Sequence, residues 1–191
     1  FIDRFTVTAE AYHIPVIIVF NKCDLYDAEQ NAAAEELMRV YNGIGYQSFM
    51  ISAKTGYNCD RLKELMKDKM SMFSGHSGVG KSALVNRLDP NLNVRVGEIS
   101  EVHEKGKHTT TYAQMFPLCF GGFIIDTPGI KEFALFDLEK ETLAQRFPEM
   151  RAVMHDCHFN NCTHLHEPHC AVKEAVDKNI IAGWRYENYC N

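Results

Sequence analysis

The stretch Gly75-His76-Ser77-Gly78-Val79-Gly80-Lys81-Ser82 decides the fold, because it has the spacing G-x-x-x-x-G-K-S of a phosphate-binding loop. The run 70–73 before it is typical of a buried strand, and residues 83–88 after it have the pattern of a helix. Small residues between a strand and a helix let backbone N–H groups surround a phosphate, and the helix N-terminus adds positive charge. A chance match in a glycine-rich turn is the alternative. We therefore predict an α/β nucleotide-binding fold in which Lys81 contacts the β- and γ-phosphates and Ser82 binds Mg²⁺.

Asp126 is a second candidate for the phosphate site, since it ends another strand-like run, 122–125. Ligands of α/β proteins bind at the carboxyl ends of strands, so a carboxylate there can hold Mg²⁺ directly or through water. Gly129, three residues later, can place its N–H against a γ-phosphate. Without the phosphate-binding loop, the same residues would be interpreted as an ordinary turn.

Two further segments predict that the bound base is guanine. Asn21–Asp24 (NKCD) follows a β-branched run, and the Asp24 carboxylate can accept hydrogen bonds from guanine N1–H and the 2-amino group, which adenine does not offer. The asparagine amide can fix this loop, and the stem of Lys22 can lie across the base. Ser52–Lys54 (SAK) follows another strand-like run and can present the N–H of Ala53 to guanine O6.

The order of these segments is unusual. Small GTPases carry the phosphate-binding loop first, whereas here NKCD and SAK precede it and the Asp126 segment comes last. Such a circular permutation is tolerated by a compact domain with neighbouring termini. With residues 106–111 (GKHTTT) and a late Cys/His cluster, the chain resembles the ribosome small subunit-dependent GTPase A family (RsgA, also called YjeQ or YloQ).

The resemblance implies a circularly permuted P-loop GTPase fold in residues 1–134, with a mostly parallel sheet covered by helices on both faces. A small helical zinc-binding domain is expected in residues 135–191. The resemblance further implies GTP hydrolysis to GDP and phosphate in late maturation of the small ribosomal subunit, with contact to its rRNA. Five of six expected strands can be placed, so the sixth, like an OB-fold domain, is expected upstream of Phe1. The five strands are predicted at 14–20, 47–51, 70–74, 112–119 and 122–126.

The polar stretch 97–108 is predicted to be a mobile switch loop whose Thr109 or Thr110 closes the Mg²⁺ shell. Ile130 stands where many GTPases place a glutamine that orients the attacking water, and isoleucine cannot do this. The resemblance suggests that His108 takes over this role, and a surface histidine without a role is the alternative. Slow turnover is therefore expected until a partner orders the loop.

Three late cysteines and a histidine have the composition of a structural zinc site, Cys157-x4-Cys162-x-His164-x5-Cys170. From the residues alone, other nearby histidines compete for the fourth position, and the family pattern favours His164. The alternative is a set of buried cysteines with incidental histidines. The aromatic residues of 184–189 suit RNA stacking, but such helix positions are more often core.

Composition excludes several classes of protein. The chain has 191 residues, 46% of them hydrophobic, so disordered and low-complexity classes are excluded. A formal net charge of −5 argues against broad coating of nucleic acid by this chain alone. Seven cysteines, odd in number and unevenly spaced, indicate reduced thiols rather than a disulfide framework. We expect a cytoplasmic monomer without a membrane span.

Two other classes of function stay open. One is a metabolic P-loop kinase or ATPase, or another non-ribosomal NTPase, with a C-terminal segment stabilised by a metal ion. The other is a nucleotide-dependent binding module in which Ile130 reflects lost hydrolysis. Under the leading hypothesis the residues that contact nucleotide are Asn21, Lys22, Asp24, Ser52, Ala53, Lys54, Gly75, His76, Ser77, Gly78, Val79, Gly80, Lys81, Ser82, Ala83, Asp126 and Gly129. Catalysis is assigned to His108, Lys81 and Thr110; Mg²⁺ to Ser82, Thr109, Thr110 and Asp126; and zinc to Cys157, Cys162, His164 and Cys170.

Overall fold

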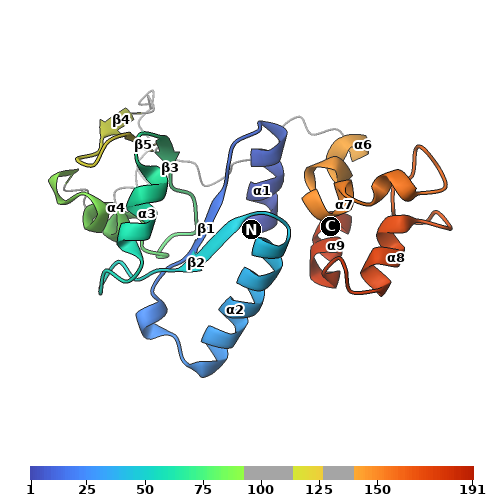
Figure 1. Cartoon of the computed structure of the whole chain (residues 1–191), viewed down its shortest axis with the longest axis horizontal. Helices are drawn as coiled ribbons and strands as arrows, with labels where there is room; N and C mark the ends of the chain where they lie inside the picture. Colours follow the sequence, from blue (N-terminus) through green and yellow to red (C-terminus); the bar gives the residue numbers. More distant parts are fainter. Residues whose placement is uncertain (93–113, 127–139) are drawn as a thin grey trace, which may run out of the picture. The chain divides into compact units, whose positions relative to one another are not determined.

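The structure is a computed structural model that describes residues 1–92, 114–126 and 140–191 (Figure 1). By contacts between residues, the chain divides into two compact units, which are described in turn. The first contains Phe1–Ile18, Leu37–Gln47 and Phe133–Asn191, and the second contains Val19–Glu36 and Ser48–Glu132.

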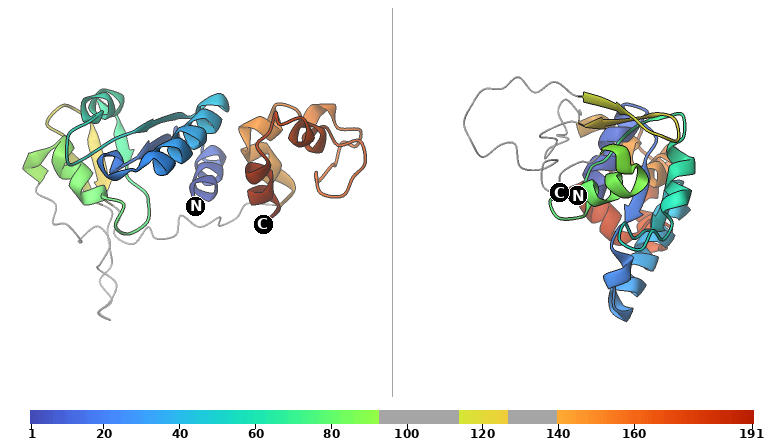
Figure 2. Two further views of the ribbon diagram at one scale, coloured as in Figure 1. Left: turned by 90° about the horizontal axis from the view of Figure 1, so that it is seen from below. Right: turned by 90° about the vertical axis from the view of Figure 1, so that its left-hand side faces the viewer.

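All five predicted strands are present, each shorter than the sequence suggested. Strands β1 and β2 form a two-stranded sheet, and the other three form a sheet in the order β3-β5-β4. Strand β3 runs parallel to β5, with Met70 opposite Phe123, and β4 runs antiparallel to β5. These three strands lie side by side in both views of Figure 2. The bounds are β1 Ile17–Phe20, β2 Gln47–Met50, β3 Met70–Met72, β4 Gln114–Pro117 and β5 Phe123–Asp126.

The turn between β4 and β5 depends on glycine. Gly122 has φ +84°, and a Cβ on it would lie 2.5 Å from the carbonyl oxygen of Lys69, so a side chain would collide with backbone. The buried carboxylate of Asp89 accepts a hydrogen bond of 2.7 Å from the N–H of Cys119 in this turn. Because β3 and β5 are parallel, their carboxyl ends meet at one edge, which puts Asp126 at the edge where the phosphate-binding loop begins.

Three helices belong wholly or partly to the second unit: α2 (Ala28–Gly43), α3 (Cys59–Met66) and α4 (Lys81–Leu88). Of α2, only the part up to Glu36 falls in this unit. The apolar faces of α3 and α4 are buried, as expected for helices that cover a sheet. Buried apolar side chains from these two helices and from β2 and its end are Phe49, Ile51, Cys59, Leu62, Met66, Leu84, Val85 and Leu88.

The first unit joins the N-terminal helix to the C-terminal part of the chain. Its helices are α1 (Ile2–Ala11), α6 (Lys140–Leu143), α7 (Pro148–Arg151), α8 (Ala171–Asp177) and α9 (Gly183–Cys190). Short 3₁₀ turns lie at Ala144–Arg146 and Met154–Asp156. Val7 of α1 is buried in one apolar cluster with Phe147, Met150, Val172 and Ile181.

The predicted domain boundary after residue 134 remains a prediction, because residues 127–139 lie outside the described part of the chain. None of the described helices combines the length with the apolar composition that a membrane span requires.

Candidate nucleotide site and metal centre

The phosphate-binding loop runs from the end of β3 to the start of α4, as the sequence predicts. Gly78 and Gly80 adopt φ of +80° and +94°, a conformation that favours glycine. A Cβ on Gly80 would lie 2.5 Å from Asn21 Nδ2, so the close approach of the two loops also requires glycine here. Gly80 is the N-cap of α4, which directs the positive end of the helix toward the loop.

The side chain of Lys81 makes hydrogen bonds to the phosphate-binding loop itself. Its Nζ donates to the carbonyl of Gly75 at 2.6 Å and to that of His76 at 3.0 Å. Burial lowers the pKa of Lys81, because desolvation disfavours the ammonium ion. Carbonyl oxygens carry only a partial negative charge. A phosphate bound in the loop would therefore balance the positive charge of Lys81 more fully.

Asn21 links the two predicted base-reading segments to the phosphate-binding loop. Its Nδ2 donates to the carbonyl of Val79 at 2.9 Å, and its Oδ1 accepts from the N–H of Ala53 at 3.2 Å. Lys22 Nζ donates to the carbonyl of Gly78 at 2.6 Å. The expectation that the N–H of Ala53 meets guanine O6 stays a prediction, since this N–H here donates to Asn21.

Asp24 is oriented by Ser52. The hydroxyl of the fully buried Ser52 donates to Asp24 Oδ1 at 2.6 Å, and its oxygen accepts from the N–H of Thr55 at 3.1 Å. Asp24 itself is exposed, and among the described residues nothing donates to its Oδ2. A fixed, exposed carboxylate of this kind suits a ligand with two adjacent N–H groups.

A cavity of about 610 Å³ adjoins both loops and is lined by Lys22, Tyr26, Phe73, Gly78 and Lys81, among others. It is of the size of a small-molecule site. The structure therefore brings the predicted base-reading and phosphate-binding residues to one place in the second unit.

Part of the predicted site lies outside the described residues. This holds for His108, Thr109, Thr110 and Gly129, and for Ile130. Asp126 ends β5, and its side chain is not described. The roles of these residues stay predictions.

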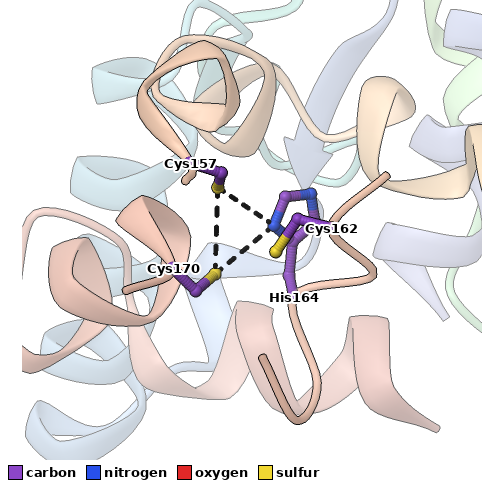
Figure 3. Close-up of side chains that lie close together, drawn as sticks. All are labelled: Cys157, Cys162, His164 and Cys170. Atoms are coloured by element: carbon purple, nitrogen blue, oxygen red, sulfur yellow. Dashed lines mark hydrogen bonds between the residues drawn. The ribbon is translucent and has the colours of Figure 1, made fainter. Parts of the chain in front are cut away.

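The four predicted zinc ligands come together in the first unit (Figure 3). The Sγ atoms of Cys157 and Cys170 are 3.9 Å apart, and His164 Nδ1 lies 3.5 Å and 3.4 Å from them. All four ligand atoms, including that of Cys162, lie within 4.8 Å of one another. Tetrahedral zinc with bonds of about 2.3 Å to sulfur and about 2.0 Å to nitrogen places ligand atoms roughly 3.5–3.8 Å apart. The residues therefore fit a tetrahedral metal ion.

The electrostatics of this cluster also suit a cation. Burial raises the pKa of Cys162 to about 12, because desolvation disfavours the thiolate, and the neighbouring thiols of Cys170 and Cys157 add to this effect. Burial lowers the pKa of His164, although the charge of Glu167 acts in the opposite direction, so the imidazole is neutral. Neutral imidazole is the form that binds metal, and a cation would offset the cost of the thiolates.

Two tyrosines of α9 hold the backbone that carries His164. The hydroxyl of Tyr186 donates to the carbonyl of His164 at 2.6 Å, and that of Tyr189 donates to the carbonyl of Thr163 at 2.7 Å. His164 has φ +62°, an uncommon conformation for a side chain of this size. Tyr186 and Tyr189 therefore pack against the apolar cluster and fix the metal-binding segment, which favours the core interpretation over RNA stacking for these two residues.

The sequence profile of the RsgA GTPase family matches residues 1–136. This chain belongs to the RsgA GTPase family. The resemblance drawn from the motifs is thus confirmed.

Curated RsgA relatives align with 99–100% of the chain. "Small ribosomal subunit biogenesis GTPase RsgA 2" of Bacteroides thetaiotaomicron is 50% identical over 100% of this chain and 62% of its own length. The RsgA protein of Bacteroides fragilis strain YCH46 is 50% identical over 99% of this chain and 61% of its own length. The chain therefore spans about three fifths of the length of these relatives.

Two solved structures of the family have the same fold. YjeQ from Thermotoga maritima has a TM-score of 0.83 and 40% identity, over 99% of this chain and 62% of that one. YloQ, described as a circularly permuted GTPase, has a TM-score of 0.78 and 32% identity, over 99% of this chain and 59% of that one. This chain thus has the circularly permuted GTPase fold that the motif order predicts.

The sequence does not reveal the roles of four residues that shape the two sites: Tyr26, Glu167, Tyr186 and Tyr189. Each acts through a hydrogen bond to another residue's backbone. Only Glu167 carried a usable signal, because an acidic residue inside a metal-binding loop commonly caps backbone N–H groups.

Proposed function

We propose that this chain is the nucleotide-hydrolysing and zinc-binding part of a GTPase that acts in late maturation of the small ribosomal subunit. The observation that carries the proposal is the position of Asn21, whose side chain bonds both the phosphate-binding loop and the Ser52–Lys54 segment. This arrangement is expected of a site that reads a guanine base and its phosphates together. The ribosomal role is supported by the names of the curated relatives.

In the proposed complex, Asp24 accepts hydrogen bonds from guanine N1–H and the 2-amino group, and the stem of Lys22 covers the base. Lys81 Nζ exchanges its bonds to Gly75 and His76 for the β- and γ-phosphates. The other residues assigned to the phosphates and to Mg²⁺ keep their predicted roles. Ser82, Asp126 and one of Thr109 and Thr110 would hold a Mg²⁺ ion. When bound, this ion would neutralise part of the phosphate charge.

Hydrolysis forms a bond between a water oxygen and the γ-phosphorus, while the bond to the bridging oxygen of GDP breaks. We assign His108 to orienting this water and accepting its proton, since Ile130 offers no polar group. Slow turnover without the ribosomal subunit follows if the segment that carries His108 is ordered by that partner.

For the first unit we propose one structural zinc held by Cys157, Cys162, His164 and Cys170. With all four positions taken by protein ligands, no water is left for the metal to activate, so this site would stabilise the fold rather than catalyse. We further propose that the protein acts in the cytoplasm as a monomer, with the small ribosomal subunit and its rRNA as partners.

The decisive experiment compares nucleotides. We expect GDP to bind much more tightly than ADP, and GTP turnover to rise when small ribosomal subunits are added. Asp24→Ala should lower GDP affinity at least about tenfold, because two charge-assisted hydrogen bonds are lost. The matched control Asp60→Ala removes an exposed carboxylate of α3 and should leave affinity unchanged.

Two outcomes would contradict the proposal and favour another class. Equal affinity for ADP and GDP would indicate an adenine-nucleotide kinase or ATPase. Strong GDP preference without turnover, even with subunits present, would indicate a nucleotide-dependent binding module.

A further inference from the structure

The base-reading loop holds a backbone conformation that needs support. Lys22 has φ +67°, in the left-handed region that non-glycine residues rarely adopt. This residue turns the chain between Asn21, which bonds two other loops, and Asp24, which is aimed by Ser52. Small shifts in this turn would therefore move both side chains that the proposed guanine site depends on.

Tyr26, which lies outside the NKCD segment, makes a direct hydrogen bond to this turn. The hydroxyl of Tyr26 donates to the backbone carbonyl of Asn21 at 3.0 Å, across five residues of the loop. The Tyr26 ring lines the cavity that also contains Lys22 and Lys81. Burial raises the pKa of Tyr26, so the phenol stays protonated and able to donate at neutral pH.

Tyr26 is itself held in place by the start of α2. The N–H of Gln30 donates to Asp27 Oδ1 at 2.8 Å, and the N–H of Asp27 donates to Gln30 Oε1 at 3.2 Å. These reciprocal bonds form a capping box, which fixes the direction from which the chain enters a helix. Asn31 Nδ2 also donates to the carbonyl of Tyr26 at 3.4 Å. The backbone of Tyr26 is thus anchored to α2 independently of the bond that the hydroxyl makes to Asn21.

We propose that Tyr26 is a positioning residue for guanine recognition: its hydroxyl holds the carbonyl of Asn21 so that the Asn21 amide keeps its bonds to Val79 and Ala53 and the Asp24 carboxylate faces the base. This inference rests on the proposed function, because it names a further determinant of the same site. Tyr26 makes no contact with the base in this scheme and acts through the loop.

The test is Tyr26→Phe, which removes the hydroxyl and keeps the ring. We expect the affinity of the chain for GDP to fall about three- to tenfold, as for the loss of one hydrogen bond. Inosine diphosphate lacks the 2-amino group and therefore makes one fewer hydrogen bond to Asp24. Tyr26→Phe should lower the affinity for inosine diphosphate less than the affinity for GDP, so the ratio of the two affinities should move closer to one. The matched control is Tyr57→Phe, the same change on an exposed ring of the Ser52–Tyr57 loop, which should leave both affinities within about twofold.

The unfolding temperature without nucleotide separates positioning from a structural role. Unchanged GDP affinity in Tyr26→Phe would overturn the inference. So would an equal loss for GDP and inosine diphosphate together with a lower unfolding temperature, because the hydroxyl would then only stabilise the fold. If the unmodified chain itself fails to prefer GDP over ADP, the proposed function fails, which is a separate result.

Discussion

The carboxylate of Glu167 accepts hydrogen bonds from the N–H and the hydroxyl of Thr163, at 2.8 and 2.7 Å, and from the N–H groups of Leu165 and His166, both at 3.2 Å. These donors flank His164 on both sides. The bonds, above all those from Thr163, hold the pKa of Glu167 at about 2. One half-buried side chain therefore closes the loop that presents the histidine of the cluster.

Replacing Glu167 with glutamine should loosen this loop. The amide keeps one acceptor oxygen and loses the charge, so we expect zinc to be released to a chelator several-fold faster at pH 7. The folded pKa is depressed, so the contribution of the carboxylate is complete above the unfolded value of 4.5 and is lost as pH falls toward 2. The ratio of release rates between the two proteins should therefore stay constant from pH 7 to pH 5.

A coloured zinc indicator measures this release. Glu174→Gln is the control, because Glu174 pairs with an exposed lysine one helical turn away, outside the metal-binding loop. Equal release from the Glu167 and Glu174 variants would show that the hydrogen bonds of Glu167 do not secure the ligand loop.

At the scale of elements, residues 157–170 join a 3₁₀ turn to α8 without a regular element of their own. Cys170 is the N-cap of α8 and is buried in the apolar cluster of the first unit. A segment so short, with few apolar side chains, gains most of its stability from the proposed metal bonds. The metal would therefore stabilise the start of α8 as well as the loop.

Cys170→Ser tests this dependence. We expect the unmodified chain to carry about one zinc, and the variant to carry much less and to unfold several kcal/mol more easily, since structural zinc contributes on the order of 10 kcal/mol in small domains. Removing zinc from the unmodified chain with a chelator should have the same effect. Metal analysis and denaturant unfolding provide the two measurements.

The control for this change is Cys190→Ser, which alters an exposed cysteine outside the cluster and should change neither result. Full zinc content in the Cys170 variant would remove Cys170 from the ligand set.

The features that could be predicted from the sequence are those whose residues lie close together in the chain. The phosphate-binding loop and the zinc ligands each lie within fourteen or fewer consecutive residues, so their spacing reveals both sites, although the choice of His164 among the nearby histidines came from the family pattern. The sheet order β3-β5-β4 and the bond from Tyr26 to Asn21 depend on how the backbone turns, which residue types do not specify. The motif order nevertheless predicted the permuted fold, because each motif ends a strand and strand ends gather at one edge.

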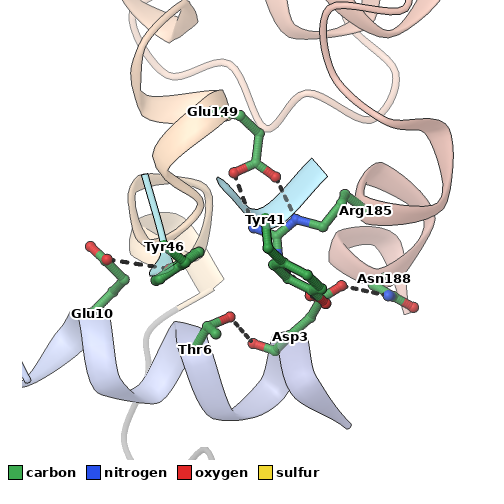
Figure 4. A network of polar contacts seen from close by, with 8 residues as sticks. All are labelled: Asp3, Thr6, Glu10, Tyr41, Tyr46, Glu149, Arg185 and Asn188. Carbon is green, nitrogen blue, oxygen red and sulfur yellow. Dashed lines mark hydrogen bonds and ion pairs between the residues drawn. The ribbon is translucent and has the colours of Figure 1, made fainter. Parts of the chain in front are cut away.

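At the scale of the molecule, a buried ionic cluster ties the two ends of the chain together within the first unit (Figure 4). The guanidinium of Arg185 on α9 is 1% exposed and bonds Asp3 of α1 and, at 2.6 and 3.0 Å, Glu149 of α7. Asp3 also accepts from the hydroxyl of Tyr41 at 2.7 Å and from Asn188 Nδ2 at 2.6 Å. Burial alone would lower the pKa of Arg185, but its two carboxylates outweigh this effect and raise it.

This ionic cluster could not be predicted from the sequence. Asp3 and Arg185 are 182 residues apart, and a charged residue on a short helix is ordinarily expected to face solvent. Its presence means that α1, which precedes the base-reading segments in the chain, shares its packing with the proposed zinc-binding part. A mutation in α1 should therefore affect the stability of that part.

Arg185→Met measures the contribution of the cluster. The methionine fills part of the space but leaves Asp3 and Glu149 buried without a counter-charge, so we expect a loss of about 3–5 kcal/mol in unfolding free energy. The single tryptophan, Trp184, packs edge-on against Tyr41 at 5.7 Å between ring centroids, so its fluorescence in a denaturant titration reports on this unit. The matched control is Arg151→Met, which breaks a half-exposed pair with Glu10 at 3.1 Å and should cost at most about 1 kcal/mol. Equal losses in the two variants would mean that the buried charges are reached by water and that the cluster does not hold the ends of the chain together.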